Sequence, residues 1–151
     1  MESFANSTFD EIQVGATVSA TRRLSATDVE ALALVSGDID AFHLAGPEAG
    51  QGMFAEAVGA EAFLSGLLQR RLPGPGTTIV AQDLRFAGTV TAGDEVVASV
   101  TAKEKRPADH QILFDCRVRL GDRDLITGTV LVQAPTRRIT YSDVATPEIV
   151  L

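Results

Sequence analysis

The feature that most constrains the fold of this chain is a change in the spacing of its apolar residues near position 77. Upstream of that point, apolar side chains recur at the spacing of one face of an α-helix. Downstream they alternate with polar side chains, as on a β-strand with one buried face. The alternation is clearest in HQILFDCRVRL, His110–Leu120. We therefore expect an α+β domain in which an antiparallel sheet packs one face against a helix.

The upstream part predicts an extended segment and two helices. The extended segment is Thr17–Leu24, and the first helix begins at a capping box made by Thr27 and Glu30 and ends at Gly37. The second and longest helix is predicted over Met53–Arg71, before the prolines and glycines of LPGPG. Its face toward the sheet is expected to consist mostly of small residues: Phe54, Ala57, Val58, Ala62 and Ser65.

The downstream part predicts four strands within one domain. They are Thr77–Phe86, Asp94–Lys105, His110–Leu120 and Leu125–Gln133, with a hairpin turn at Gly121–Asp124. We expect residues 1–151 to form a single domain, with a polar and peripheral tail at about 136–151.

Composition excludes several classes of partner. The net charge of −7 argues against nucleic acid and against anionic membranes. No apolar run is long enough to span a bilayer, and the first residues lack the pattern of a signal peptide. The one cysteine, Cys116, cannot form an internal disulfide, which favours a reducing, cytoplasmic location.

The stretch SGDIDAFH, Ser36–His43, places a carboxylate and an imidazole five residues apart after a predicted helix. Asp38 and His43 can share one water and move its proton, which is general acid–base chemistry. The alternative is a C-capping turn in which Asp38 caps the helix, Asp40 is solvated and His43 packs on the next segment. The spacing by itself leaves both readings open.

The sequence LVSGDIDAFHL resembles the hydratase motif S-G-D-x-N-P-x-H of the MaoC-like (R)-specific enoyl-CoA hydratases, and the similarity extends from about Phe9 to Pro135. Five segments look like one particular subgroup: TFDEIQVG, LPGPGT, QDLRF, GDEV and EKRP. In that subgroup the MaoC domain stands alone or is fused to a phosphate acetyl- or butyryltransferase domain. This chain is too short to hold that second domain. The resemblance implies a hot-dog fold, an antiparallel sheet wrapped around a long central helix.

The resemblance assigns the water-binding pair to Asp38 and His43. The family's Asn is Asp40 here, which removes a hydrogen-bond donor and adds a negative charge near Asp38. Ser65, in LSGLLQRRLPG, matches a serine on the family's central helix that lies at the substrate, although a small serine on a helix is also ordinary packing.

A family H-G-M sequence, whose glycine N–H binds the thioester oxygen, is missing between His43 and Ser65. An N–H near Val58 or Gly59 is the expected substitute, because a helix N-terminus favours developing negative charge. A helix that begins at Met53 would defeat this assignment.

Other candidates are interpreted as structural. His110 is expected at the surface, Cys116 packed and unreactive, and no metal-ligand cluster is apparent. Six basic residues are either solvated or available to the phosphates of CoA: Arg70, Arg71, Arg85, Lys103, Lys105 and Arg106.

We therefore expect reversible hydration of trans-2-enoyl-CoA to (R)-3-hydroxyacyl-CoA, with an acyl-CoA substrate and neither metal nor redox cofactor. A hot-dog thioesterase and a non-catalytic acyl-thioester-binding subunit are the alternatives. Exposed edge strands predict a homodimer or higher homo-oligomer in which the sheets continue edge to edge.

Overall fold

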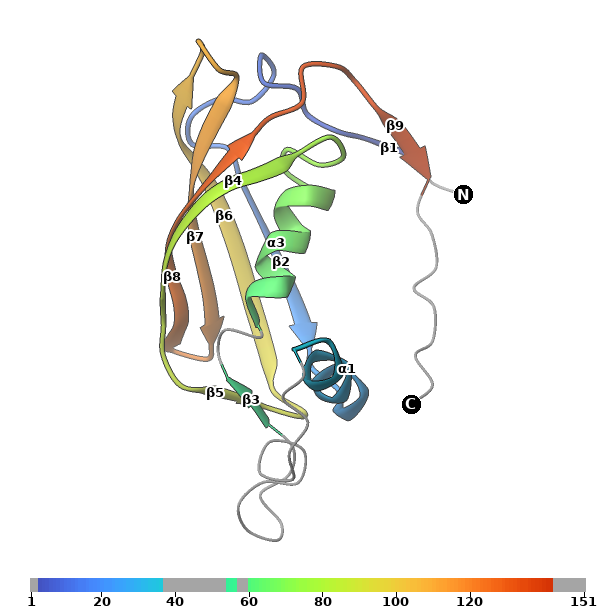
Figure 1. The fold of residues 1–151 in the computed structure, drawn as a ribbon, viewed down its shortest axis with the longest axis vertical. Coiled ribbons are helices and arrows are strands. Elements are labelled where there is room, and N and C mark those ends of the chain that lie inside the picture. Colours follow the sequence, from blue (N-terminus) through green and yellow to red (C-terminus); the bar gives the residue numbers. More distant parts are fainter. Residues whose placement is uncertain (1–2, 37–53, 57–59, 143–151) are drawn as a thin grey trace, which may run out of the picture.

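The computed structural model describes residues 3–36, 54–56 and 60–142, and within them one antiparallel sheet dominates (Figure 1). Its five strands lie in the order β2-β6-β7-β8-β4. Their bounds are β2 Thr17–Arg23, β4 Thr78–Phe86, β6 Glu95–Arg106, β7 Gln111–Leu120 and β8 Arg123–Gln133. The sheet curves around helix α3, Glu61–Arg70, and helix α1, Ala26–Ser36, lies near the start of α3 (Figure 1). The predicted α+β hot-dog architecture is confirmed.

Helix α3 packs on the sheet through leucines. Leu64, Leu67 and Leu68 are buried, and α3 contacts β6, β2 and β7. The prediction of a small-residue face is wrong, because Ala62 is exposed and Ser65 is only half-buried. Leucines bury more apolar area than small residues would, and this burial is the main source of stability of the contact between α3 and the sheet.

The predicted helix over Met53–Arg71 is wrong in its first part. Phe54–Glu56 forms strand β3, which pairs antiparallel with β5, Thr89–Thr91. Helix α3 therefore starts at Glu61, and α1, with 11 residues, is longer than α3, with 10. Ala and Glu favour helices intrinsically, but this preference is at most about 0.7 kcal/mol per residue, and pairing with a neighbouring strand overrides it.

Helix α1 begins two residues earlier than predicted. The capping box is formed by Ser25 and Asp28: the Asp28 N–H donates to Ser25 Oγ at 3.1 Å, and the Ser25 N–H donates to Asp28 Oδ2 at 2.9 Å. Thr27 lies inside the first turn. Two S/T-x-x-D/E patterns overlap here, and the one preceding the helix supplies the cap.

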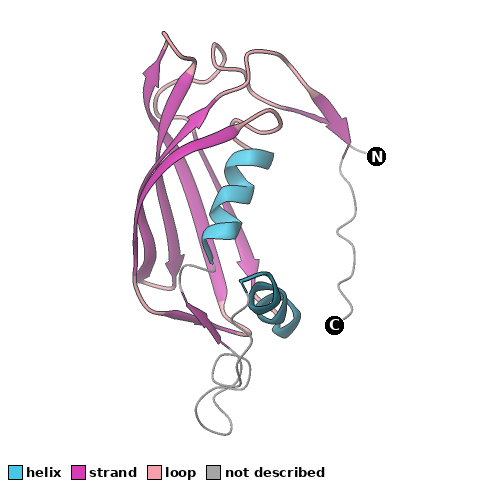
Figure 2. Cartoon of the chain, in the orientation of Figure 1, coloured by secondary structure: helices cyan, strands magenta, loops and turns pink. Residues whose placement is uncertain are grey.

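The first and last described strands pair in a further two-stranded sheet that the sequence did not predict. Strand β1, Ser3–Ala5, pairs with β9, Thr140–Ser142 (Figure 2). The buried Asn6 joins the two segments, because its side-chain amide donates to the carbonyl oxygens of Pro75 and Arg137 at 2.9 and 3.0 Å. Its Oδ1 accepts from the Ile139 N–H at 2.8 Å. In the described part of the chain, no helix is long and apolar enough to cross a membrane.

Candidate active site

The residues of the predicted catalytic motif follow helix α1 directly in the chain. Ser36 is the last residue of α1. Asp38, Asp40 and His43 lie outside the described residues. The roles of these three residues therefore stay predictions.

The start of helix α3 is the second fixed point of the candidate site. Ala60 is its N-cap, in a helical conformation and without a side-chain capping hydrogen bond. The first N–H groups of a helix lack partners inside the helix and carry partial positive charge. Val58 and Gly59, predicted to hold the thioester oxygen, immediately precede Ala60 in the sequence and lie outside the described residues. Because α3 starts at Glu61 and not at Met53, Val58 and Gly59 precede the helix in the sequence, as this assignment requires.

Ser65 lies in the first half of α3 and is bonded to a carboxylate. Its Oγ donates to Glu61 Oε1 one turn earlier. The Glu61 charge also contributes to the raised pKa of the Cys116 thiol on β7. Glu61 and Ser65 thus form a half-buried polar pair on α3. The sequence analysis overlooked Glu61, although its i, i+4 spacing from Ser65 is typical of such a pair.

A groove of about 650 Å³ lies on the other side of α3, between that helix, α1 and β2. Phe63, Gly66 and Leu67 line it from α3, and Ala31 and Leu32 from α1. Ser65 is not among its lining residues. The two neighbouring positions 65 and 66 therefore present different surroundings to a bound molecule.

The groove carries charged groups at its margin. Arg22 and Asp28 form an ion pair at 2.9 Å, and Arg70 and Arg71 also line the groove. Burial raises the pKa of Asp28, but its hydrogen bonds to Ser25 and Arg22 outweigh this and hold that pKa below its ordinary value. Asp28 therefore stays ionised, and it caps α1 and pairs with Arg22 at the same time.

The two residues predicted to be structural are placed as expected. Cys116 is buried, and desolvation, followed by the nearby Asp115 and Glu61 charges, raises the pKa of its thiol to about 12. His110 is exposed at the turn before β7, with its ring edge-on to Phe9 at 5.3 Å between centroids. Among the described residues, no group of three or more His, Cys, Asp or Glu side chains is arranged to hold a metal ion.

Comparison with curated proteins finds relatives that are named as hydratases or as a dehydratase of CoA thioesters. The chain is 30% identical over 133 residues to an (R)-specific enoyl-CoA hydratase of Rhodospirillum rubrum, covering 85% of this chain and 92% of that protein. It is 30% identical over 129 residues to an (R)-specific enoyl-CoA hydratase of Aeromonas caviae, covering 82% and 96%. A 3-hydroxybutyryl-CoA dehydratase of Methylorubrum extorquens is 29% identical over 133 residues, covering 85% of each chain.

Solved structures agree with these relatives. The unliganded R-hydratase PhaJ1 of Pseudomonas aeruginosa superposes with a TM-score of 0.89 and 26% identity, covering 99% of both chains. The (R)-hydratase of A. caviae gives a TM-score of 0.74 at 29% identity, covering 82% of this chain and 98% of that one. No protein-family model matches the chain.

Proposed function

Since this chain belongs to the family of MaoC-like (R)-specific enoyl-CoA hydratases, we propose that it reversibly hydrates a trans-2-enoyl-CoA to the (R)-3-hydroxyacyl-CoA. The observation that carries the proposal is the sequence SGDIDAFH, placed directly after α1 in a chain that shares the hydratase fold over almost its whole length. The curated relatives are named as hydratases or as a dehydratase. The two names describe the same reversible reaction, addition of water in one direction and its removal in the other.

In the proposed mechanism, Asp38 removes a proton from a water that His43 holds in position. The water oxygen bonds to C3 of the enoyl group, and the electron pair of the double bond moves toward the thioester oxygen. The proton then returns to C2, so the reaction adds one water and consumes nothing else. Neither a metal nor a redox cofactor has a role in these steps.

The N-terminus of α3 supports the charge that develops on the thioester oxygen. A backbone N–H near Val58 or Gly59 is proposed to donate to this oxygen, assisted by the positive end of the helix. Ala60 supplies no side-chain cap that would compete for that position. Losing one such donor typically lowers kcat by about 10²–10³-fold.

The decisive experiment combines two single variants with their double variant. Asp38→Asn removes the base and His43→Gln removes the imidazole, so each is expected to lower kcat at least about 100-fold. Because both residues act on one water, the double variant should be little worse than the poorer single variant. His110→Gln and Asp122→Asn make the same replacements at exposed positions and serve as controls.

The assay uses crotonyl-CoA and follows enoyl absorbance and thiol release separately. Loss of enoyl absorbance without thiol release supports hydration. Thiol release would instead identify a thioesterase, and neither signal would favour a non-catalytic binding subunit. Near-full turnover in both single variants would refute the shared-water mechanism.

A second experiment asks which side of α3 receives the acyl thioester. Ser65 is proposed as a substrate-binding residue, so Ser65→Leu should raise KM or block turnover. Gly66→Leu adds the same bulk on the groove side, where a Cβ at position 66 meets nothing within 4 Å. If only Gly66→Leu loses activity, the acyl thioester binds in the groove and not beside Ser65.

We also propose a homodimer in which strand β4 pairs with β4 of a second copy. Among the described strands, β4 has one neighbour in the sheet, β8, and its Val80 and Phe86 are 49% and 45% exposed. Val80→Lys should shift sedimentation toward the monomer, because lysine on an edge strand opposes pairing. Val14→Lys, at another exposed valine away from β4, is the control. A monomer at all concentrations in the unsubstituted protein would exclude the dimer.

The remaining features of the proposal concern setting. Apart from the water that is added, the acyl-CoA is the one small-molecule partner that the mechanism requires. The single cysteine, Cys116, cannot form a disulfide within the chain, and on this ground we propose that the protein acts in the cytoplasm.

A further inference from the structure

The outer face of the five-stranded sheet carries two adjacent rows of side chains that cross all five strands. The acidic row, in spatial order, is Thr17, Thr101, Asp115, Thr129 and Asp83. The basic row is Ser19, Ser99, Arg117, Thr127 and Arg85. On every strand the two members are two residues apart, so both project from the same face. The residues between them include Val100 and Cys116, which are buried on the α3 side.

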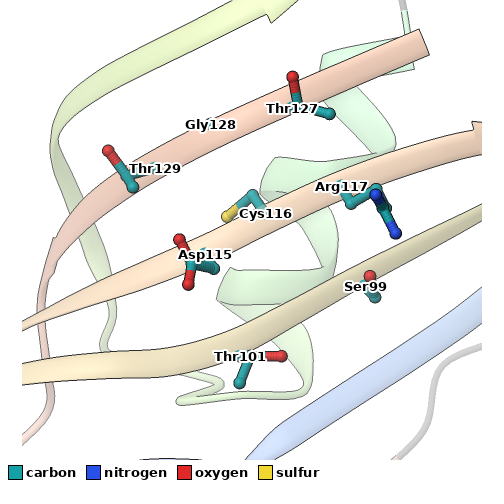
Figure 3. Close-up of a pocket in the computed structure, with 8 residues that line it drawn as sticks. All are labelled: Ser99, Thr101, Asp115, Cys116, Arg117, Thr127, Gly128 and Thr129. Carbon is teal, nitrogen blue, oxygen red and sulfur yellow. The ribbon is translucent and has the colours of Figure 1, made fainter. Parts of the chain in front are cut away.

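The strand pairing is regular throughout these two rows. The register shifts fall elsewhere, between Ile79 and Ala81, between Ala102 and Glu104, and between Val118 and Arg119. A shallow hollow of about 390 Å³ lies where the rows cross β6, β7 and β8 (Figure 3). Members of both rows line it, so the centre of an outward-curving face has room for side chains from outside.

The charges in the rows are not arranged to pair across neighbouring strands. Asp115 lies directly opposite Thr101 and Thr129, and Arg117 lies opposite Ser99 and Thr127. Opposite charges stabilise a sheet best when they face each other directly across two strands. This pattern instead keeps each sign within its own row.

The ion pairs that these residues do make are weak. Lys103 Nζ lies 3.7 Å from Asp115 Oδ1, and Arg117 Nε lies 3.0 Å from Asp124 Oδ1. The four side chains are between 38% and 55% exposed. Exposed pairs of this kind contribute little to stability, so they can exchange for new partners at low cost.

We propose that this face binds the same face of a second copy of the chain. A two-fold axis that runs parallel to the rows, midway between them, lays the acidic row of each copy on the basic row of the other. Asp115 then meets Arg117 of the second copy, and Asp83 meets Arg85. Each contact occurs twice by symmetry, and hydroxyls meet hydroxyls at the remaining positions.

The size of the face sets the expected strength. Five strands about 4.8 Å apart and about nine residues long, at about 3.4 Å per residue, cover roughly 700 Å². A standard interface buries about 800 Å² per partner, and the curvature of the sheet lowers the contact further. The association should therefore be weak, and salt should weaken it by screening the paired charges.

The test is sedimentation of the full chain over a wide concentration range, at low and high salt. Arg117→Asp sets like charges against each other at both symmetric contacts and should raise the dissociation constant about a hundredfold or more. Asp115→Arg should do the same. The combined exchange, Asp115→Arg with Arg117→Asp, restores complementarity and should restore assembly. Arg106→Asp makes the same charge change beyond the two rows and should leave assembly unchanged.

The outcomes separate cleanly from those for the active site and the β4 edge. The expected result is a species twice the mass of the one formed by the single charge-reversal variants, while crotonyl-CoA hydration and thermal unfolding stay the same in all variants. If the unsubstituted chain forms no such species, the proposal is overturned. Assembly that ignores the single reversals, or that the combined exchange fails to restore, overturns it as well.

Discussion

Glycine 128 offers a stability test whose sign and size follow from local geometry. It lies in the middle of β8 with φ of +145°, a backbone conformation that side chains disfavour. A Cβ built there would lie 2.0 Å from the carbonyl oxygen of Asp83 and 3.0 Å from Leu84 Cα. Both atoms belong to the backbone of β4, so no side-chain rotation relieves the contact. Gly128→Ala must displace β4 from β8.

The magnitude has two parts. A positive φ costs a residue with a side chain about 1–2 kcal/mol. Displacing the strand weakens at least two backbone hydrogen bonds between β4 and β8, at about 0.5–1.5 kcal/mol each. The free energy of unfolding should therefore fall by about 3–4 kcal/mol. For a chain of this length the melting temperature should fall by about 10 °C.

Two other glycines make matched controls. Gly93 has φ of +98° but open space around a built Cβ, so Gly93→Ala isolates the backbone cost and should lose about 1 kcal/mol. Gly66 is in helix α3 with open space, so Gly66→Ala should gain about 1 kcal/mol. The assay is urea unfolding at one fixed protein concentration, followed by circular dichroism. Equal losses for Gly93→Ala and Gly128→Ala would refute the contact between the strands.

Three further predictions test the helix cap, the buried thiol and the motif. Asp28→Asn should destabilise the protein by about 1 kcal/mol at neutral pH, measured by urea unfolding, because it weakens the cap of α1. Since the folded pKa of Asp28 is lowered, its stabilisation is complete above the ordinary value of 3.8 and disappears as the pH falls below it. Cys116 should resist a thiol-specific chromogenic reagent until the protein is unfolded, and rapid labelling of the native protein would contradict its burial. Asp40→Asn should keep or raise hydratase activity, because it removes a negative charge near Asp38; a large loss in a folded variant would give Asp40 a catalytic role of its own.

The sequence predicted those elements whose pattern is strong and local. The alternation in His110–Leu120 located β7 within one residue, because five alternate positions face one core. The helix predicted from Met53 failed where the pattern depended on distant partners. Phe54–Glu56 is a strand only because Thr89–Thr91 lies beside it, and no local spacing encodes that pairing. Strands β1 and β9 were missed for the same reason.

For the candidate site too, the sequence predicted what local spacing encodes and missed what depends on packing. A short motif such as SGDIDAFH is legible because its chemistry resides in residue types at fixed spacing. The bond from Ser65 to Glu61 could be expected from an i, i+4 interval. The different surroundings on the two sides of α3 could not be predicted, because they depend on which face of the helix carries the buried leucines. Leu64, Leu67 and Leu68 settle that rotation and so place positions 65 and 66 in different surroundings.

The two charged rows depend on the register of the strands, which is harder to predict from the sequence than the periodicity of each strand. A hairpin turn over Gly121–Asp124 would pair Leu120 with Leu125 and hence set Asp115 opposite Val130, an exposed acid against a core valine. The turn instead has two residues, since Leu120 pairs with Arg123, and a register shift follows between Val118 and Arg119. Together they bring Asp115 opposite Thr129. A slip of one residue exchanges the two faces of a strand, so burial of Val130 selects the register. The same selection aligns the two rows on the outer face, which makes their self-complementarity a consequence of how the core packs.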